Sequence, residues 1–182
     1  SLIGGKEFEP TERNALLGLR GASRYYSHQY KEAFGIHCKA IKRVREEWGL
    51  SNVVVMVPFC RTPEEGEMVL NAMESFGLVR GKDGLEVHVM CEIPSNVILA
   101  EEFAKMFDGF SIGSGDLTQL TLGIDKESTA LSHMYNEQHP AVKKLIADVI
   151  AVAQKHKTKV GMCGQAPSDS TAFTEFLVQC GI

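Results

Sequence analysis

The sequence lacks any apolar run close to the ~20 residues needed to cross a bilayer, so it gives no sign of a membrane-spanning helix. It also lacks an excess of positive charge: 19 Lys and Arg residues stand against 23 Asp and Glu residues, for a net charge of −4. That balance gives no general attraction to nucleic acid or to an anionic membrane. The five cysteines show no CxxC spacing, which excludes the common zinc-ribbon and thioredoxin signatures and fits a reducing, cytoplasmic location.

Nucleotide-binding fingerprints are missing as well. Gly113 and Gly115 would begin a dinucleotide fingerprint only with a third glycine at position 118, where Thr118 stands. Lys82 follows a glycine, but Phe76 occupies the place where a phosphate-binding P-loop needs its first glycine. No two of the six histidines have metal-ligand spacing. The sequence therefore gives no indication of an ATP site or of a metal site built from histidines.

The first residues, SLIGGKEFEP, lack the charged and apolar regions of a signal peptide. They also lack an initiator Met, and we expect the chain to be a piece of a longer protein. A length of 182 residues suits one domain, or part of a larger one.

Short apolar runs alternate with longer stretches of helical periodicity. Five of these runs predict buried strands, at residues 16–20, 53–57, 85–91, 110–113 and 160–163. We expect helices at 26–48, at 63–76 behind Thr62 as N-cap, from Ser95 to 106, at 140–156, and in a last segment capped by Ser168 or Asp169. A turn at 81–84 and a long polar loop after Asp116 connect them.

Repeated strand–helix units predict an α/β fold with a parallel sheet covered by helices. Two architectures fit, an open doubly wound sheet or part of an eight-stranded α/β barrel with about five units present. Arg20, Glu92, Asp116 and Cys163 each follow a different predicted strand. In a barrel all these ends meet at one mouth, where active sites are built, so the pattern favours the barrel. Five strands do not close a barrel, and we expect the others outside this chain.

Two acids follow consecutive predicted strands, Glu92 in MCEIP and Asp116 in SGDLT. Neighbouring strands lie about 4.8 Å apart, so the two carboxylates could share one cation. Such a pair suits magnesium, because this hard ion prefers oxygen ligands and keeps several waters. The alternative is that each acid caps a helix or is simply solvated.

Three further side-chain types are candidates for the site. Cys163 lies between two glycines at a strand end, where it serves either reactivity or packing. Arg20, with Arg24 one helical turn later, suits a phosphate or carboxylate, although a structural ion pair explains it equally well. Arg61, in PFCRT, also ends a strand and is a further candidate.

Five stretches together resemble a known family: LGLRGASRY, NVVVMVPFCRT, GLEVHVMCEIPSN, DGFSIGSGDLTQLTLGID and VGMCGQAPSD. They look like the C-terminal domain of the phosphoenolpyruvate synthases (pyruvate, water dikinases) of the PEP-utilising enzyme family. Pyruvate, phosphate dikinase and enzyme I of the sugar phosphotransferase system are similar at a greater distance. The resemblance covers essentially all 182 residues in order, and the opening IGGKEFEP favours the synthases.

The resemblance implies a (β/α)8 TIM barrel of the phosphoenolpyruvate/pyruvate type, present in residues 1–182 as a partial barrel without its first two strands and its last. It also implies a longer, cytoplasmic, homodimeric enzyme with a phosphohistidine domain and an ATP-binding domain in the same chain. That enzyme converts ATP, pyruvate and water to AMP, phosphoenolpyruvate and phosphate.

The resemblance also implies roles for individual residues. Glu92 and Asp116 match magnesium ligands, for which manganese can substitute, and Arg20 matches an arginine that binds substrate phosphate or the enolate oxygen. Cys163 matches the cysteine that exchanges a proton with the substrate methyl carbon. The implied substrate-binding set is Arg20, Gly113, Ser114, Gly115 and Asp116.

One position departs from the family pattern. Family members usually read Ser-Asn-Asp where this chain reads Ser114-Gly115-Asp116. The missing amide normally contacts substrate, whereas glycine offers only its backbone. Three functions therefore stay open: a catalytic phosphotransferase domain, a non-catalytic or impaired binding barrel, and a relative of enzyme I or pyruvate, phosphate dikinase.

Overall fold

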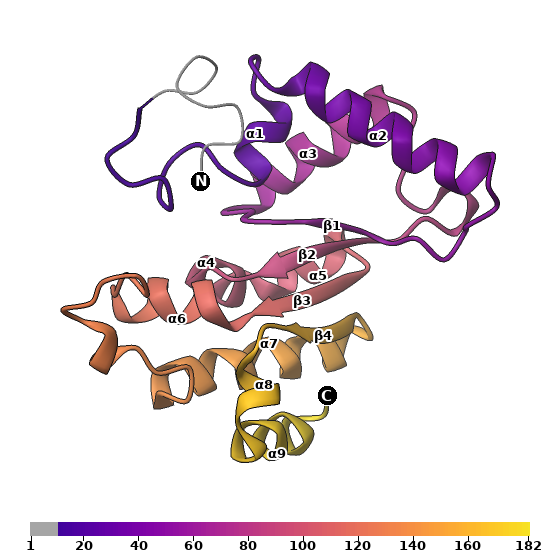
Figure 1. Ribbon diagram of the computed structural model, residues 1–182. Coiled ribbons are helices and arrows are strands. Elements are labelled where there is room, and N and C mark those ends of the chain that lie inside the picture. Colours follow the sequence, from indigo (N-terminus) through magenta and orange to yellow (C-terminus); the bar gives the residue numbers. More distant parts are fainter. Residues whose placement is uncertain (1–10) are drawn as a thin grey trace.

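The computed structural model describes residues 11–182, so the opening IGGKEFEP lies outside the described residues. One parallel sheet runs through the molecule with the strands in the order β1-β2-β3-β4 (Figure 1). Its strands are β1 (Val55–Val57), β2 (Val87–Cys91), β3 (Gly109–Gly113) and β4 (Lys159–Cys163). Four of the five predicted strands are thereby confirmed.

The register of the sheet aligns the carboxyl ends of the last three strands. Cys91 of β2 pairs with Ile112 of β3, and Gly113 pairs with Cys163 of β4. The residues that follow these pairs therefore leave the sheet side by side, at one edge.

Nine helices accompany the sheet in residues 11–182. They are α1 (Ala22–Tyr26), α2 (Lys31–Glu46), α3 (Pro63–Ser75), α4 (Pro94–Ile98), α5 (Ala100–Met106), α6 (Ser114–Leu122), α7 (Pro140–His156), α8 (Ala166–Asp169) and α9 (Thr171–Cys180). Two short 3-10 turns, η1 (Lys82–Gly84) and η2 (Ser132–Met134), lie in the connections.

The arrangement of strands and helices favours a barrel arc over a doubly wound sheet. Each strand pairs with the next strand along the chain, whereas a doubly wound sheet reverses its order at a switch point. Parallel crossovers are nearly always right-handed, so a sequential order places the connecting helices on one face. Helix α5 contacts α3 on one side and α7 on the other, and α5 and α7 lie behind the sheet in Figure 1.

The core lies between the sheet and this helical layer. Val89 in β2, Phe110 and Ile112 in β3, and Phe103 in α5 are all essentially inaccessible to water. Burying a side chain of this size stabilises the fold by about 1.5–3 kcal/mol. Burial in β2 and β3 is nearly continuous rather than alternating, which is typical of strands in a parallel sheet.

The strand predicted at residues 16–20 is wrong. The segment forms a turn, in which Leu16 N–H donates to Asn14 Oδ1 at 3.0 Å and Leu19 N–H donates to Glu12 Oε1 at 2.8 Å. Side chains that bond nearby backbone N–H groups compete with a strand ladder. Leu17 is 64% exposed, so the apolar run does not mark a buried strand.

The single helix predicted at 26–48 is divided into α1 and α2. Ser27 Oγ donates to the carbonyl of Arg24 and also lies 3.3 Å from the N–H of Tyr30, which replaces helical bonding at this point. Trp48 is 64% exposed and lies beyond the end of α2.

The polar loop predicted after Asp116 is wrong, because α6 begins at Ser114 and includes that acid in its first turn. Leu117 and Thr118 are completely buried, so this segment packs against the core although its sequence is polar. The helix ends at Gly123, whose φ of 65° is a left-handed conformation that glycine adopts without strain. The irregular connection starts only there.

Two of the predicted helices begin at other residues than expected. The predicted Ser95 helix starts at Pro94 and divides at Leu99, and the last helix is capped by Ser170 rather than by Ser168 or Asp169. In contrast, Thr62 caps α3 as predicted, by accepting the N–H of Glu65.

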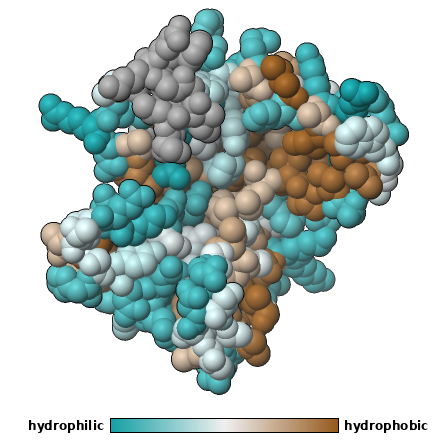
Figure 2. Space-filling model, viewed as in Figure 1, coloured by the Kyte–Doolittle hydropathy of each residue, from teal (hydrophilic) through white to brown (hydrophobic). Residues whose placement is uncertain are grey.

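The strand predicted as fully buried at 53–57 is buried only at Val57. Leu50, Val54 and Met56 are 48%, 45% and 40% exposed, and Figure 2 shows an apolar area between α2 and β1. The reason is position: within the described residues β1 pairs with β2 alone and is therefore an edge strand.

Asn96 in α4 joins the ends of β1 and β2. Its Oδ1 accepts the N–H groups of Glu92 and Ile93 at 3.2 and 3.0 Å, and its Nδ2 donates to the carbonyl of Cys60 at 2.6 Å. The side chain is completely buried, so water cannot replace these bonds.

We expect Asn96→Ala to lower the free energy of unfolding by roughly 3 kcal/mol or more, because three buried backbone groups lose their partner. Urea unfolding followed by circular dichroism measures the loss. Asn96→Asp should be at least as harmful, because it places a second acceptor against the carbonyl of Cys60 in a fully buried position. Asn71→Ala, on the exposed face of α3, is the control, and equal effects at the two positions would contradict the role of Asn96.

Candidate active site at the carboxyl ends of the strands

Glu92 is the buried acid of the site. It directly follows β2, only 7% of the residue is exposed, and its Oε1 accepts the N–H of Phe59 at 2.7 Å. Burial raises the pKa of the Glu92 carboxyl above its ordinary range, and the nearby negative charge of Asp116 raises it further. The N–H of Phe59 and the positive charges of Arg20 and Lys126 oppose this rise. The carboxylate is thus held at a cost in free energy.

Asp116 is the second acid, and two cations compensate it. Its Oδ2 lies 3.1 Å from a guanidinium nitrogen of Arg20, and its Oδ1 lies 3.4 Å from Nζ of Lys126. The side chain of Asp116 is 15% exposed, whereas those of Arg20 and Lys126 are 34% and 48% exposed. The cations therefore approach from the solvent side and can move without disturbing the core.

Gly113 creates the space that Glu92 occupies. A Cβ atom on Gly113 would lie 3.0 Å from Cβ of Glu92 and 3.1 Å from its Oε2. The next residue, Ser114, is completely buried, and within residues 11–182 its hydroxyl has no hydrogen-bond partner. The hydroxyl also lies against Gly164, where a Cβ would approach it to 2.7 Å. The start of α6 and the segment after β4 therefore meet at Ser114.

Gly115 has room for a side chain. It lies in the first turn of α6, and a Cβ there would meet only the hydroxyl of Tyr135, at an ordinary contact distance of 3.5 Å. That hydroxyl lies within hydrogen-bond distance of the Gly115 carbonyl and of Glu137. Burial, followed by the charge of Glu137, raises the pKa of Tyr135, so the phenol stays protonated.

Cys163 ends β4 directly opposite Gly113. It is the exposed member of the five cysteines, whereas Cys60 and Cys91 are completely buried. Burial raises the pKa of both these thiols to about 12, which keeps them protonated and unreactive. Accessibility therefore separates Cys163 from the structural cysteines.

A cleft of about 1260 Å³ opens beside these groups. Arg20, Phe59 and Asp116 line it together with residues of α2 and of the connection after α6. Its volume exceeds the 300–1,000 Å³ usual for small-molecule sites, because one side is open to solvent. Glu92 lies behind Phe59 rather than on the wall of the cleft.

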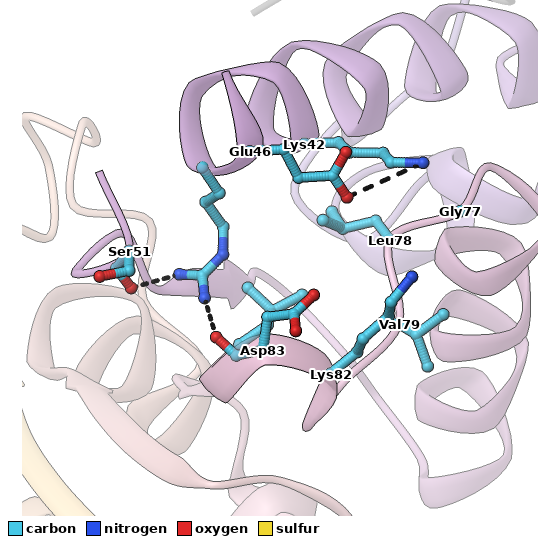
Figure 3. A pocket seen from close by; sticks show the side chains of 10 residues that line it. Lys42, Glu46, Ser51, Gly77, Leu78, Val79, Lys82 and Asp83 are labelled. Carbon is cyan, nitrogen blue, oxygen red and sulfur yellow. Dashed lines mark hydrogen bonds and ion pairs between the residues drawn. The ribbon is translucent and has the colours of Figure 1, made fainter. Parts of the chain in front are cut away.

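A smaller pocket of about 270 Å³ lies at the opposite end of the sheet, before β1 and β2 (Figure 3). There Arg45 donates to the carbonyls of Ser51, Val53 and Asp83 at 2.5, 2.6 and 2.9 Å. The guanidinium thus ties the end of α2 to two loops. The amino-terminal face of α/β barrels usually serves stability, and this arrangement agrees with that rule.

The structure brings three predicted residues together: Arg20, Asp116 and, behind Phe59, Glu92. Arg20 reaches the site from a turn and not from the strand end that was predicted. Arg24 stacks on Tyr30 and donates to its hydroxyl, and Arg61 pairs with Glu65, so both take part in structural contacts.

Four residues of the site were missed by the sequence analysis. Phe59 contributes its backbone N–H, and the side chain of Asn96 bonds backbone groups of other residues, and neither kind of contact leaves a pattern in the sequence. Lys126 and Tyr135 belong to the connection after α6, which the sequence showed only as part of a polar loop. Gln119 of α6 holds the start of this connection near Asp116, because its Oε1 accepts the N–H of Lys126 at 3.0 Å.

The parallel sheet and the polar groups at its carboxyl end define an α/β protein with a candidate site at its strand ends. The model of the family "PEP-utilising enzyme, PEP-binding domain" matches residues 4–182, and the chain belongs to this family. No helix among residues 11–182 has the length and apolar character required to cross a membrane.

The similar proteins are phosphoenolpyruvate synthases. That of Aquifex aeolicus (strain VF5) is 61% identical over 182 residues, which are 100% of this chain and 21% of that protein. Those of Synechocystis sp. and Escherichia coli (strain K12) are 56% and 47% identical over the whole chain and over 22% and 23% of their own lengths. The chain therefore spans about a fifth of the curated relatives it matches.

Among solved structures, the HpcH/HpaI aldolase from Desulfitobacterium hafniense DCB-2 has a TM-score of 0.49 at 16% identity, over 70% of this chain and 54% of that chain. A likeness of this size carries no argument for function. The support for a barrel arc is the strand order described above.

We expect Glu92→Gln to stabilise the metal-free protein at neutral pH. The pKa of Glu92 is raised above its ordinary value of 4.5, so in the folded state the carboxyl must ionise against burial. Stability is therefore lost as the pH rises from about that value through the raised pKa, and Gln removes this loss. Melting temperatures from pH 4 to 8, with a chelator present, should separate the two proteins progressively.

The matched control is Glu102→Gln, at an exposed position of α5, which should leave the melting temperature unchanged at every pH. A Glu92→Gln protein that melts below the unmodified protein at pH 8 would contradict the cost assigned to Glu92.

Proposed function

We propose that this domain binds pyruvate and phosphoenolpyruvate with magnesium, and that pyruvate is enolised and phosphorylated on it. The observation that carries the proposal is the convergence of Glu92, Asp116 and Arg20 at the carboxyl ends of the strands. Family membership and the names of the relatives support the same substrate class. The site has acids for a cation and a guanidinium for an anion.

The residues present fit a magnesium ion. Residues 11–182 contain no cluster of three or more His, Cys, Asp or Glu side chains suited to hold a metal. Magnesium does not need such a cluster, because it typically takes one or two carboxylates and completes its shell with water and substrate. Glu92 and Asp116 would supply these carboxylates, and Oε2 of Glu92 lies beside Gly113, which has no side chain to cover it. Manganese can substitute, since it also prefers oxygen ligands.

Arg20 and Lys126 neutralise Asp116 while no cation is bound. A cation on Asp116 would release these two side chains, and both are exposed enough to move. Arg20 then neutralises the phosphoryl group or the enolate oxygen, because a guanidinium matches both by paired hydrogen bonds. A bound magnesium ion would supply charge stabilisation for the developing enolate oxygen.

Cys163 holds and moves the proton of the methyl carbon in this proposal. Its thiol is exposed at the end of β4, directly across from Gly113, so it reaches the mouth of the site. A thiol positioned beside the substrate can exchange a proton with carbon. As a thiolate, Cys163 takes a proton from the methyl group of pyruvate when the enolate forms, and the resulting thiol returns that proton to carbon when the reaction runs backward.

The other features of the longer relatives come to this chain only as part of the proposal. In a full-length protein, an ATP-binding domain and a phosphohistidine domain would deliver the phosphoryl group, and further strands would cover the edge of β1. A homodimer and a cytoplasmic location belong to the same proposal. The isolated chain should then bind substrate without making phosphoenolpyruvate from ATP.

A second candidate function is a binding barrel with weakened catalysis. The observation in its favour is Gly115, which offers no side-chain amide to a substrate. The retained acids, Arg20 and Cys163 favour the catalytic reading instead.

Titration calorimetry of the full-length polypeptide with phosphoenolpyruvate, with and without magnesium, tests the proposal. We expect binding that depends on magnesium and is lost in both Asp116→Asn and Glu92→Gln, because each removes one negative ligand. Glu102→Gln is the control and should bind like the unmodified protein. Binding of equal strength without magnesium, or in Asp116→Asn, would contradict the metal assignment.

We expect Gly115→Asn to tighten phosphoenolpyruvate binding by about tenfold or more. The new amide can donate one charge-assisted hydrogen bond, worth roughly 1.5–3 kcal/mol, and about 1.4 kcal/mol corresponds to tenfold. Helical backbone and open space at Gly115 accept the side chain.

Gly115→Ala is the matched control, since it adds a Cβ without an amide. Calorimetry with saturating magnesium compares the three proteins. Equal affinity for Asn and Gly would mean that the backbone N–H of Gly115 already serves the ligand.

A further inference from the structure

Phe59, which follows Pro58 at the end of β1, has an unusual backbone conformation. Its φ is 45°, in the left-handed region that bulky residues rarely adopt, and only 2% of the residue is exposed. The other non-glycine residues of positive φ in residues 11–182 are Asp83 and Lys157, both in exposed turns. Such strain persists only where surrounding contacts impose it, and it is concentrated at functional sites.

The peptide unit between Pro58 and Phe59 is held at both ends. Its carbonyl accepts the N–H of Ala22, at the start of α1, at 2.9 Å. Its N–H donates to Oε1 of Glu92 at 2.7 Å, a charge-assisted bond of short length. A carboxylate with one oxygen occupied in this way has a defined orientation and leaves its other oxygen for a ligand.

The ring of Phe59 contacts the two arginines at the mouth of the site. The guanidinium carbon of Arg20 lies 4.2 Å from the ring centroid, and that of Arg61 lies 5.0 Å from it. Arg61 is itself fixed by Glu65, so it supports the ring and does not compete for a ligand. Cation–π contacts of this kind hold a guanidinium over one face of the ring.

Gly21, next to Arg20 in the chain, makes this contact possible. Its φ is 56°, and a Cβ there would lie 2.4 Å from both Cβ of Phe59 and the carbonyl oxygen of Pro58. The chain around Arg20 can therefore approach Phe59 only with glycine at position 21. The close approach places Arg20 over the ring.

We propose that Phe59 is a positioning residue, an inference that rests on the proposed function. Its N–H orients Glu92 for the cation, and its ring holds the guanidinium of Arg20 for the anionic substrate. One strained residue thereby sets the cation-binding carboxylate and the anion-binding guanidinium relative to each other. The two actions use different atoms, so substitutions can separate them.

Phe59→Leu removes the ring and keeps the peptide N–H. In the full-length polypeptide we expect about fivefold weaker binding of phosphoenolpyruvate, the size of a partly buried cation–π contact. Manganese affinity, measured by electron paramagnetic resonance, should stay within about twofold, since the orientation of Glu92 is retained. Phe103→Leu, a ring of the same size completely buried in α5, is the control and should change neither affinity.

Phe59→Gly keeps both the N–H and the positive φ, which glycine adopts without strain, so manganese affinity should stay within about twofold. Gly21→Ala instead displaces the peptide, because its Cβ would lie 2.4 Å from the carbonyl oxygen of Pro58. We expect manganese binding to weaken by about tenfold in Gly21→Ala, the usual loss when a group that orients a metal ligand is disturbed. Unchanged manganese affinity in Gly21→Ala would overturn the role of the N–H.

A double-mutant cycle with Arg20→Ala separates positioning from general support of the fold. If the ring acts through Arg20, Phe59→Leu should weaken phosphoenolpyruvate binding in the unmodified protein and have no further effect in Arg20→Ala. The same loss in both backgrounds, or no loss in either, would overturn the inference alone. Failure of the unmodified protein to bind manganese and phosphoenolpyruvate would overturn the proposed function and the inference with it.

Discussion

Two carboxylates held close together, Glu92 and Asp116, are the constraint on which the rest of the site depends. Burial raises the pKa of Glu92, and the nearby charge of Asp116 raises it further. The surrounding groups all compensate the negative charges: the N–H of Phe59 at Glu92, and Arg20 and Lys126 at Asp116. A protein that keeps such an arrangement gives up stability for it, which is typical of sites that bind cations.

The sheet provides the geometry that this arrangement needs. Parallel register places Glu92 beside Gly113, and the absence of a side chain on Gly113 leaves room for the carboxylate. Asn96 then fixes the backbone at Glu92 to the end of β1. The rigid part of the site is therefore built on strand ends, whereas Arg20 and Lys126 come from connections that can move.

Much of the sheet and of the site could be predicted from the sequence, because these features depend on hydrophobic periodicity and on which residues follow a strand. The apolar runs of β2, β3 and β4, the cap at Thr62 and the two strand-end acids all have local signals. Arg20 was placed at a strand end for the same reason, but side-chain bonds from Glu12 and Asn14 turn that segment away from a strand. The approach of Arg20 to Asp116 spans 96 positions of the chain and has no local signal.

The contacts of Phe59 could not be predicted either, since they use a peptide N–H and a left-handed backbone at a residue that reads as ordinary core. Helix α6 was missed because its buried face includes Thr118 and Gln119, polar residues that a hydropathy pattern assigns to a loop. Both failures have one physical cause: tertiary packing decides where a local preference is weak.

The proposed function requires that Glu92 and Asp116 share one divalent cation. This can be tested with a crystal structure of the full-length polypeptide with manganese, with anomalous diffraction at the manganese edge. We expect one anomalous peak coordinated by a carboxylate oxygen of each acid, with Lys126 displaced from Asp116. A map without a peak between the two acids, in which Asp116 still pairs with both Arg20 and Lys126, would contradict it.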